Sequence, residues 1–336
     1  MQIIKNIKVP TGNILVGNGD KGKIEFLSIG DYGQDKNVKA DFLGLTKDIQ
    51  GVPDGEIMPL EEKWVITISS QYSCSMNCQF CDVPKVPQNP INATYNDLKN
   101  QVVKALKLYP DVYTTKRLNI HVARMGEPTF NPNVIQFGKD LLKIVRPYVN
   151  RSHVHPVIST MLPRKNKNLM KFLNEWTIDI KNEKFRGAAG LQFSINSTSD
   201  IQRNEMFSGS SLSLKEISEI GKSLIDPVGR KYALNFAIAD GYQVDAEKLR
   251  QLFSPKKFMV KITPIHATRS CNENDIKTTE GYKAFTPYQK IEQELKDNGF
   301  DVIVFVPSYE EDLGLITCGN AILSGNLPKI KYEEIT

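Results

Sequence analysis

Three of the five cysteines, Cys74, Cys78 and Cys81, lie within eight residues of one another. Three thiolates do not complete the four-coordinate shell of a structural zinc site, and the remaining cysteines, Cys271 and Cys318, stand alone far downstream. A four-iron cluster held by three cysteines leaves one iron without a protein ligand, and that iron can bind a substrate or cofactor. The spacing therefore predicts an iron–sulfur site, with a zinc knuckle and a chance cluster of buried thiols as the alternatives.

The composition sets the broad class of the protein. With 336 residues and 40% hydrophobic content, the chain can bury a core as one barrel-like α/β domain or as two smaller domains. A formal net charge of +5 permits an anionic partner without requiring one. No apolar run reaches membrane-spanning length, the first residues lack a signal-peptide pattern, and the odd number of cysteines favours a reducing compartment. We expect a cytoplasmic protein with no membrane partner.

Strand and helix patterns alternate along the chain. The predicted strands are 64–68, 118–122, 154–159, 190–195, 232–238 and 258–263, and the predicted helices are 94–109, 132–147, 166–175, 213–225 and 245–252. A further helix and strand are expected at 287–298 and 301–306. Six parallel strands with crossover helices predict a partial or full α/β barrel, in which the chemistry gathers at the carboxyl ends of the strands.

The predicted organisation has three parts. Residues 1–60 form a small N-terminal β-rich appendage with strands near 23–29 and 39–43, residues 61–325 form the barrel core with a C-terminal cysteine segment, and residues 326–336 form a tail. Several candidate residues follow predicted strand ends and should converge in space: Cys74, Glu127, Ser159, Ser194 and His266.

An ordered set of motifs resembles the RlmN/Cfr family of radical S-adenosylmethionine (SAM) enzymes, which methylate adenine carbons in RNA. The C-x3-C-x2-C spacing with Phe80 before the last cysteine resembles the radical SAM motif. The other motifs, in chain order from about residue 57 to 325, are Ile68–Cys74, Met125–Pro128 with Asn131, Ser159-Thr160, Ser194–Asn196, Arg203–Glu205, Ile262–Pro264 and Thr317–Asn320. The resemblance implies a partial α/β barrel of the radical SAM type, in agreement with the strand and helix alternation.

The resemblance also implies a [4Fe–4S] cluster on Cys74, Cys78 and Cys81, with SAM bound to its fourth iron. Gly126 and Glu127 would contact the amino-acid end of SAM. The remaining cofactor contacts, to the ribose, carboxylate or adenine, would come from Ser159, Ser194, Ile195, Asn196 and His266. Plainer roles exist for some of them, because Glu127 would also cap the segment that follows it and the serines would also serve as turn hydroxyls.

The chemistry implied is reductive cleavage of SAM to a 5′-deoxyadenosyl radical, supplied with electrons by a reductase such as flavodoxin or ferredoxin. In the RlmN-like route, a cysteine near the C-terminus carries a methyl group from a first SAM, and the radical from a second SAM converts it into a methylene that adds to an sp2 carbon. Cys318 stands at that position. An isolated cysteine among apolar residues is otherwise a small buried hydrophobe.

The sequence departs from the family in ways that concern the substrate. The family closes its cycle with a second cysteine on the strand before the cluster, but Thr67 stands there, and a hydroxyl forms no disulfide. Cys271 is a candidate substitute. The family's general base would fall on Asp54 or Glu56, which are otherwise loop charges. The family's N-terminal RNA-binding helical domain is also missing, and Arg124 replaces a glycine.

Three hypotheses follow. The first is an enzyme, a radical SAM transferase that moves a SAM-derived carbon fragment (methyl, methylene or adenosyl) to an sp2 carbon of a small heteroaromatic substrate such as a pterin, a folate or a nucleoside. The second is an RNA adenine C-methyltransferase of the RlmN/Cfr type. The third is a non-catalytic zinc or nucleic-acid-binding module that uses the clustered cysteines.

Overall fold

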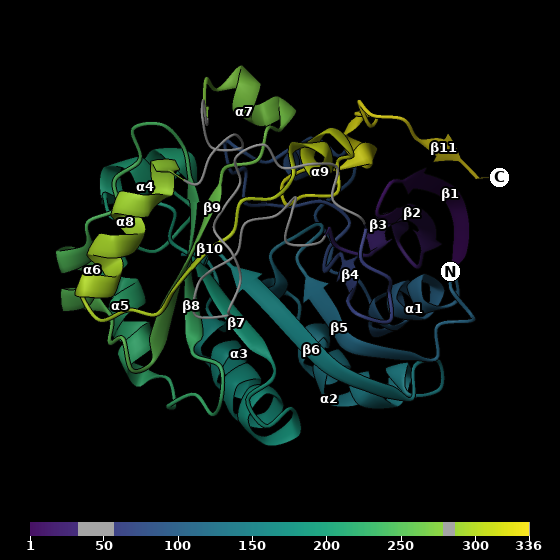
Figure 1. Cartoon of the computed structure of the whole chain (residues 1–336), viewed down its shortest axis with the longest axis horizontal. Helices are drawn as coiled ribbons and strands as arrows, with labels where there is room; N and C mark the ends of the chain where they lie inside the picture. The colour runs from purple at the N-terminus through teal and green to yellow at the C-terminus, as the bar shows by residue number, and fades with distance from the viewer. Residues whose placement is uncertain (33–56, 278–285, 336) are drawn as a thin grey trace.

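One curved sheet with helices on its outer side forms the framework of the protein (Figure 1). The computed structural model describes residues 1–32, 57–277 and 286–335. The sheet has eleven strands in the order β10-β9-β8-β7-β6-β5-β4-β3-β2-β1-β11. The predicted strand at 39–43 and the candidate bases Asp54 and Glu56 lie outside the described residues.

Parallel strands build the barrel part of the sheet. They are β4 (Trp64–Ile68), β5 (Thr114–Val122), β6 (Arg151–Thr160), β7 (Gly190–Ser194), β8 (Tyr232–Ile238), β9 (Phe258–Pro264) and β10 (Val302–Val304). Each strand pairs in parallel with the next one along the chain. This arrangement confirms the predicted partial α/β barrel, because β10 ends the sheet instead of pairing with β4.

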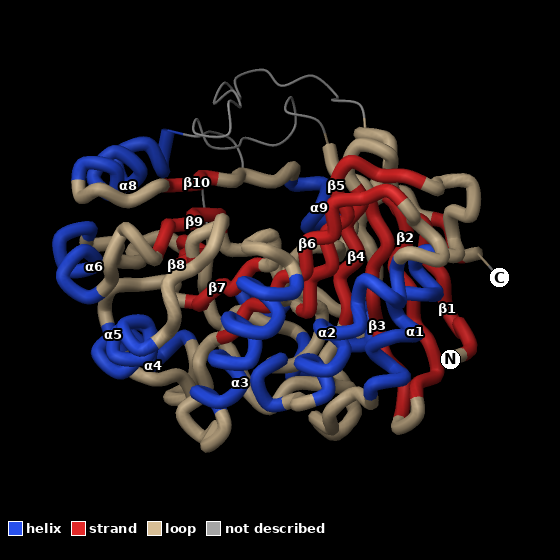
Figure 2. The backbone as a smooth tube through the Cα atoms, turned by 90° about the horizontal axis from the view of Figure 1, so that it is seen from below, coloured by secondary structure: helices blue, strands red, loops and turns tan. Residues whose placement is uncertain are grey.

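The crossover helices cover the outer face, and Figure 2 shows α1, α2, α3 and α5 together on one side of the strands. The predicted helices correspond to α1 (Tyr95–Leu106), α2 (Asn133–Val145), α3 (Leu169–Glu175), α5 (Leu214–Ser223), α6 (Ala246–Leu252) and α8 (Thr286–Asp297). The sequence analysis did not predict α4 (Asp200–Met206), α7 (Arg269–Glu273), α9 (Tyr309–Leu313) or the π-helix η4 (Trp176–Lys184) that continues α3. Among the described residues, no helix has the length and apolar character needed to cross a membrane.

The N-terminal strands extend the same sheet. β1 (Gln2–Val9), β2 (Gly12–Gly19) and β3 (Gly22–Ile29) are antiparallel, and β3 pairs with β4. The predicted strand at 23–29 is β3, whereas β1 and β2 were not predicted individually. At the far edge, β11 (Glu333–Glu334) pairs with β1. Both ends of the chain therefore meet at one edge of the sheet (Figure 1).

The two faces of the barrel strands differ in chemistry, because side chains alternate along a strand. The helix-covered outer face carries apolar residues with no exposed surface: Ile66, Ile120, Ile158, Leu234 and Val260. The strand register places polar residues together on the inner face: Thr67, His121, Ser159, Gln192, Ser194, Asn235 and Lys261. The sheet thus buries one face for stability and keeps the other polar, as expected for a barrel that binds a ligand.

Asp97 ties helix α1 to the strand-end loop that leads to the cysteines. Its buried carboxylate accepts hydrogen bonds from the Tyr72 hydroxyl at 2.6 Å and from the backbone N–H groups of Asp20 at 3.0 Å and Thr94 at 2.9 Å. Thr94 returns a bond to the Asp97 N–H, which completes a capping box at the start of α1. One side chain therefore fixes the helix, the β2–β3 turn and the loop together.

Replacing this carboxylate should destabilise the fold. We expect Asp97→Ala to lower the free energy of unfolding by about 2 to 4 kcal/mol, because buried donors that bonded to a charged acceptor lose their partner. Urea denaturation measures the change. The exposed Asp111 offers a control, since Asp111→Ala should stay within about 0.5 kcal/mol of wild type. Equal stability of the two variants would contradict the role assigned to Asp97.

Candidate iron–sulfur and cofactor site

The three clustered cysteines lie in the loop that follows β4. Cys74, Cys78 and Cys81 are each partly exposed, and the Cys81 N–H donates to the Cys78 carbonyl at 3.1 Å. Burial raises the pKa of Cys74 to about 12, while hydrogen bonds from the backbone of Met76 and Gly126 act in the opposite direction. The thiol loop is thus held by backbone groups that point at sulfur, a common feature of iron–sulfur sites.

The thiols disfavour one another's ionisation. Burial raises the pKa of Cys78 well above its usual value, and the neighbouring Cys81 and Cys74 raise it further. Burial and then Cys74 do the same to the pKa of Cys81. Three thiolates at this place need a compensating positive charge, which a bound metal group provides.

The residues present fit a cluster better than a single ion. Among the described ranges, no group of three or more His, Cys, Asp or Glu side chains is arranged to hold a metal ion. A four-iron cluster spreads three thiolates over three separate irons, whereas two sulfurs on one zinc lie only about 3.8 Å apart. The number of thiols, their mutual influence and the backbone N–H groups directed at sulfur suit a cluster with one open iron.

The structure brings Cys318 beside the cysteine loop. Cys318 is exposed, and the carbonyl of the next residue, Gly319, accepts a hydrogen bond from the Asp82 N–H at 2.7 Å. Gly319 has a φ of +88°, and a Cβ there would lie 3.3 Å from the Phe80 carbonyl oxygen. Cys318 is also near enough to contribute to the raised pKa of Cys81. Cys81 and Cys318 lie 237 positions apart in the sequence but are neighbours in the structure.

A buried ion pair holds the Cys318 segment in place. Arg124 follows β5 and pairs with Glu25 of β3, and both side chains are almost completely buried. The Arg124 guanidinium also donates to the carbonyls of Leu315 at 2.8 Å and Thr317 at 3.2 Å. Glu25 in turn accepts from the Leu323 N–H at 3.0 Å. The arginine that departs from the family pattern thus anchors both sides of the cysteine segment.

Gly126 and Glu127 lie next to the cysteine loop. Gly126 has a φ of +94°, and a Cβ at that position would come within 2.6 Å of the Gln71 Cβ, so only glycine fits. The buried Glu127 accepts from the Thr129 hydroxyl at 2.7 Å and from the Met161 N–H at 3.1 Å, and it caps the 3₁₀ turn η3 (Pro128–Phe130). Burial raises the pKa of Glu127, and these hydrogen bonds oppose the rise. The capping role is present, and its contact with SAM stays a prediction.

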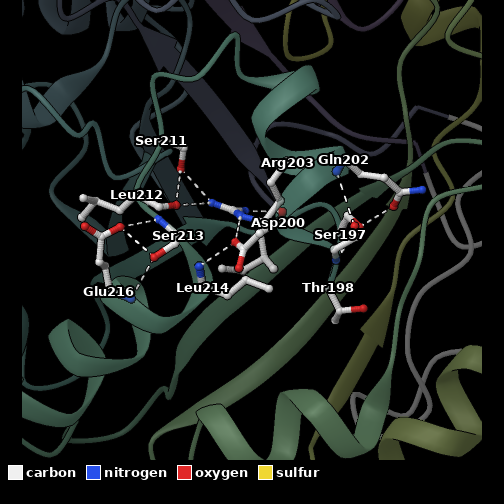
Figure 3. Close-up of polar contacts among 12 residues, drawn as sticks. Ser197, Thr198, Asp200, Gln202, Arg203, Ser211, Leu212, Ser213, Leu214 and Glu216 are labelled. Carbon is white, nitrogen blue, oxygen red and sulfur yellow. Dashed lines mark hydrogen bonds and ion pairs between the residues drawn. The ribbon is translucent and has the colours of Figure 1, made fainter.

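Arg203 of α4 positions the segment Ser194–Asn196 through its guanidinium. Figure 3 shows that guanidinium beside Ser211 and Leu212. The guanidinium donates to the carbonyls of Ser194 and Ile195 and to the Ser211 hydroxyl, the last at 2.7 Å. Asn196 has a φ of +60°, and its Oδ1 accepts from the Ala237 N–H at 3.1 Å. A buried arginine thereby fixes the backbone at the end of β7, as a cofactor-binding turn requires.

The other predicted site residues lie on the inner side of the sheet or close to Cys318. Ser159 donates to Gln192 Oε1 at 3.2 Å on the inner face. His266 Nδ1 lies 2.9 Å from Asp312 Oδ1, and the same oxygen accepts from the Thr317 hydroxyl at 2.5 Å. His266 is therefore linked to the Cys318 segment through Asp312. Cys271 is buried, with its sulfur 3.7 Å from the Phe80 carbonyl oxygen.

Sequence reasoning missed two features of the site. The partner of Arg124 could not be found from spacing, because Glu25 lies in a distant strand. Lys261 lies on the inner face of β9 between the buried Val260 and Ile262. A lysine within an otherwise apolar strand is unusual, and this feature of the sequence could have marked Lys261 as a candidate site residue.

Removing one member of the buried Arg124–Glu25 ion pair should lower the stability of the folded protein. We expect Arg124→Met to lower the free energy of unfolding by about 3 to 5 kcal/mol, because Glu25 is left as an unpaired buried charge. The double variant Arg124→Met with Glu25→Leu should recover much of that loss. The exposed pair of Lys116 and Glu62 gives the matched control, with a cost below about 1 kcal/mol for Lys116→Met. Urea denaturation measures the free energy of unfolding of each variant. Equal losses in Arg124→Met and Lys116→Met would refute the stabilising role assigned to the buried pair.

Comparison with known proteins extends the sequence resemblance. No protein-family model matches the chain. A probable dual-specificity RNA methyltransferase RlmN from Cytophaga hutchinsonii is 22% identical over 202 residues, which make up 60% of this chain and 52% of that protein. The aligned part thus spans about half the length of that relative. A protein of the same name from Clostridium botulinum is 23% identical over 306 residues, or 90% of this chain and 81% of that protein.

A solved structure shows the same fold. The radical SAM methyltransferase from Sphaerobacter thermophilus superimposes with a TM-score of 0.61 at 16% sequence identity, over 95% of this chain and 80% of that protein. The match confirms the predicted partial barrel of the radical SAM type. The chain is therefore similar in sequence to RlmN methyltransferases and shares the fold of a radical SAM methyltransferase.

Proposed function

We propose that the protein transfers a SAM-derived carbon fragment, a methyl, methylene or adenosyl group, to an sp2 carbon of a small heteroaromatic substrate such as a pterin, a folate or a nucleoside. The observation that carries the proposal is the junction of two segments: the Asp82 N–H of the cysteine loop bonds to the Gly319 carbonyl beside Cys318. The cysteine loop and the segment of the candidate carbon carrier are therefore neighbours, which supports a shared site.

Cys74, Cys78 and Cys81 would hold the cluster, and Gly126, Glu127, Ser159, Ser194, Ile195, Asn196 and His266 would surround SAM. When bound, these cofactors supply reductive cleavage of a carbon–sulfur bond to a 5′-deoxyadenosyl radical, with the electron delivered by a reductase such as flavodoxin or ferredoxin. The chain itself contributes orientation. Gly126 permits close approach of the backbone, and Arg203 keeps the turn after β7 fixed.

Cys318 is the candidate carrier of the carbon fragment. It is exposed, and the neighbouring Asn320 donates to the Thr317 hydroxyl in a 2.8 Å hydrogen bond that shapes its turn. The ion pair of Arg124 and Glu25 limits movement of the segment relative to the cysteine loop. A fixed sulfur can then face the acceptor carbon of the substrate.

The disulfide that ends the family's reaction cycle cannot form here between the two positions that the family uses. Thr67 lies on the inner face of β4 opposite His121 of β5, and its hydroxyl cannot bond to sulfur. Cys271 is buried, its sulfur lies near the Phe80 carbonyl, and burial raises its pKa. The absence of a ready disulfide favours a substrate and a cycle that differ from RNA methylation.

RNA adenine methylation is the second candidate, supported by the similarity to probable dual-specificity RNA methyltransferases. It requires a resolving cysteine, and Cys271 is the candidate among the described residues. Loss of RNA methylation in Cys271→Ala, with the cluster intact, would favour this alternative. Modified adenine in the RNA of expressing cells, found by nucleoside mass spectrometry, would decide for it over the small substrate.

The cluster assignment predicts the metal content. Protein reconstituted without oxygen should bind about four irons and four sulfides and, with SAM and dithionite, should release 5′-deoxyadenosine. Cys78→Ala should lose the cluster absorbance and the product. Cys271→Ala serves as the matched control and should keep the iron content. Zinc without iron or sulfide in the wild type would instead support the third hypothesis, the zinc or nucleic-acid-binding module.

The carrier role of Cys318 predicts a modified peptide. After anaerobic incubation with methyl-labelled SAM, mass spectrometry should find the label on the peptide that contains Cys318, and Cys318→Ala should lose it. Cys271→Ala should retain the label, since the Cys271 thiol is buried whereas Cys318 is exposed. An unlabelled Cys318 in protein that does form 5′-deoxyadenosine would show that the radical attacks the substrate directly.

A further inference from the structure

The inner face of the sheet carries an unusual set of cations. Lys261 of β9 pairs in register with Asn235 of β8, and Asn235 pairs with Ser194 of β7, so the three side chains share the inner face. Arg117 and His121 of β5 lie on the same face, since they are four residues apart in one strand. We give the name inner cation cluster to Arg117, Lys261 and Arg230, the last of which lies in the loop before β8; the neutral His121 lies among them.

Two members of this cluster lack counter-charges. Within residues 1–32, 57–277 and 286–335, neither the Lys261 ammonium nor the Arg230 guanidinium has a hydrogen-bond partner or an ion pair. The Lys261 nitrogen lies 5.9 Å from the centre of the Phe305 ring. By contrast, Lys63 at the start of β4 pairs with Asp31. An unpaired charge inside a fold is expensive and is retained where a ligand completes it.

The charges act on one another. Burial lowers the pKa of His121 to about 3, and Lys261, Arg230, Lys63 and Arg117 add to this effect. Burial lowers the pKa of Lys261 as well, and Arg230 contributes to the decrease. Lys261, Arg230 and Arg117 thus lie within electrostatic range of His121, and the strand register places Lys261 and His121 on the inner face. A bound anion would relieve the repulsion among the cations.

The position of the cluster relates it to the reactive sulfur. Lys261 lies within electrostatic range of Cys318, which acts to raise the lysine pKa against the effect of burial. Beside Lys261, the buried Oδ1 atom of Asn235 has no hydrogen-bond partner in the described part of the chain. An acceptor without a donor next to an unpaired cation suits a ligand that carries both an anionic group and an N–H group.

We propose that the inner cation cluster binds an anionic group of the substrate, a phosphate or a carboxylate, through Lys261 and Arg230, and that Asn235 accepts from an N–H of its heteroaromatic ring. Anchored there, the ring would face Cys318. The inference rests on the proposed function and narrows the substrate class to a nucleotide or an acidic pterin derivative. Neutral nucleosides and unsubstituted pterins would lack the anchor.

Matched ligand pairs test the proposal on cluster-loaded protein with SAM and no reductant, by anaerobic isothermal titration calorimetry. The first pair is adenosine 5′-monophosphate and adenosine, which tests a phosphate. The second is folic acid and pterin, which tests a carboxylate. In at least one pair, the anionic member should bind at least about 10-fold more tightly than its neutral partner, as a charged hydrogen bond contributes on that order.

The variants Lys261→Met and Arg230→Gln should weaken binding of that anion by about 10- to 100-fold each and leave the neutral partner's affinity unchanged. Iron content and the thermal unfolding transition show whether each variant is folded. Lys215→Met, on the exposed side of α5, is the matched control and should bind the anion as the wild type does.

The outcomes separate this inference from the proposed function. If no anionic ligand binds the wild type more tightly than it binds Lys261→Met and Arg230→Gln, the inner cation cluster is not an anion site and the inference is wrong. If the wild type fails to form 5′-deoxyadenosine with dithionite, the proposed function itself fails. A wild type that cleaves SAM but shows no preference for anions contradicts the inference alone.

Discussion

The arrangement of the site depends on one buried ion pair between Arg124 and Glu25. A charged pair taken out of water is costly unless further hydrogen bonds satisfy both partners, and here the surplus donors and acceptors come from the segment around Cys318. The pair therefore binds three distant parts of the chain through one electrostatic contact: an N-terminal strand, the turn before Gly126 and the C-terminal cysteine loop. If any of the three were misplaced, a charge would remain buried and unpaired.

The sheet has an apolar outer face and a polar inner face, so the same strands can both stabilise the fold and present polar groups to a ligand. The outer residues pack under the helices and provide the hydrophobic stability of the barrel. The inner residues are freed from that task, so serines, asparagines and cations can project from the same strands. Such a barrel keeps polar groups inside only where backbone and side-chain partners, or a ligand, complete them.

The alternation of strands and helices was predictable from sequence, because apolar periodicity reports burial directly. The bounds of β4 and β8 agree with prediction for that reason. The short helix α4 and the π-helix η4 were not predictable from sequence, because tertiary contacts decide where they form. For α4, one such contact is the hydrogen bond from Arg203 to the turn after β7. The cysteine spacing and the motif order predicted a cluster site, and the structure brings Cys318 beside the predicted cysteines. The pairing of Arg124 with Glu25 and the gathering of the inner cations depend on contacts between distant strands, which no local pattern records.

The terminal strand β11 has a consequence for how the protein is made. β11 pairs with β1, and the Ile335 N–H donates to the Asn6 carbonyl at 2.8 Å, so the last residues join the first strand (Figure 1). Ribosomes release the C-terminal segment last, and only then can the edge of the sheet close over the first hairpin. The Cys318 segment, which precedes β11, thus reaches the site only after strands β1 to β10 have emerged.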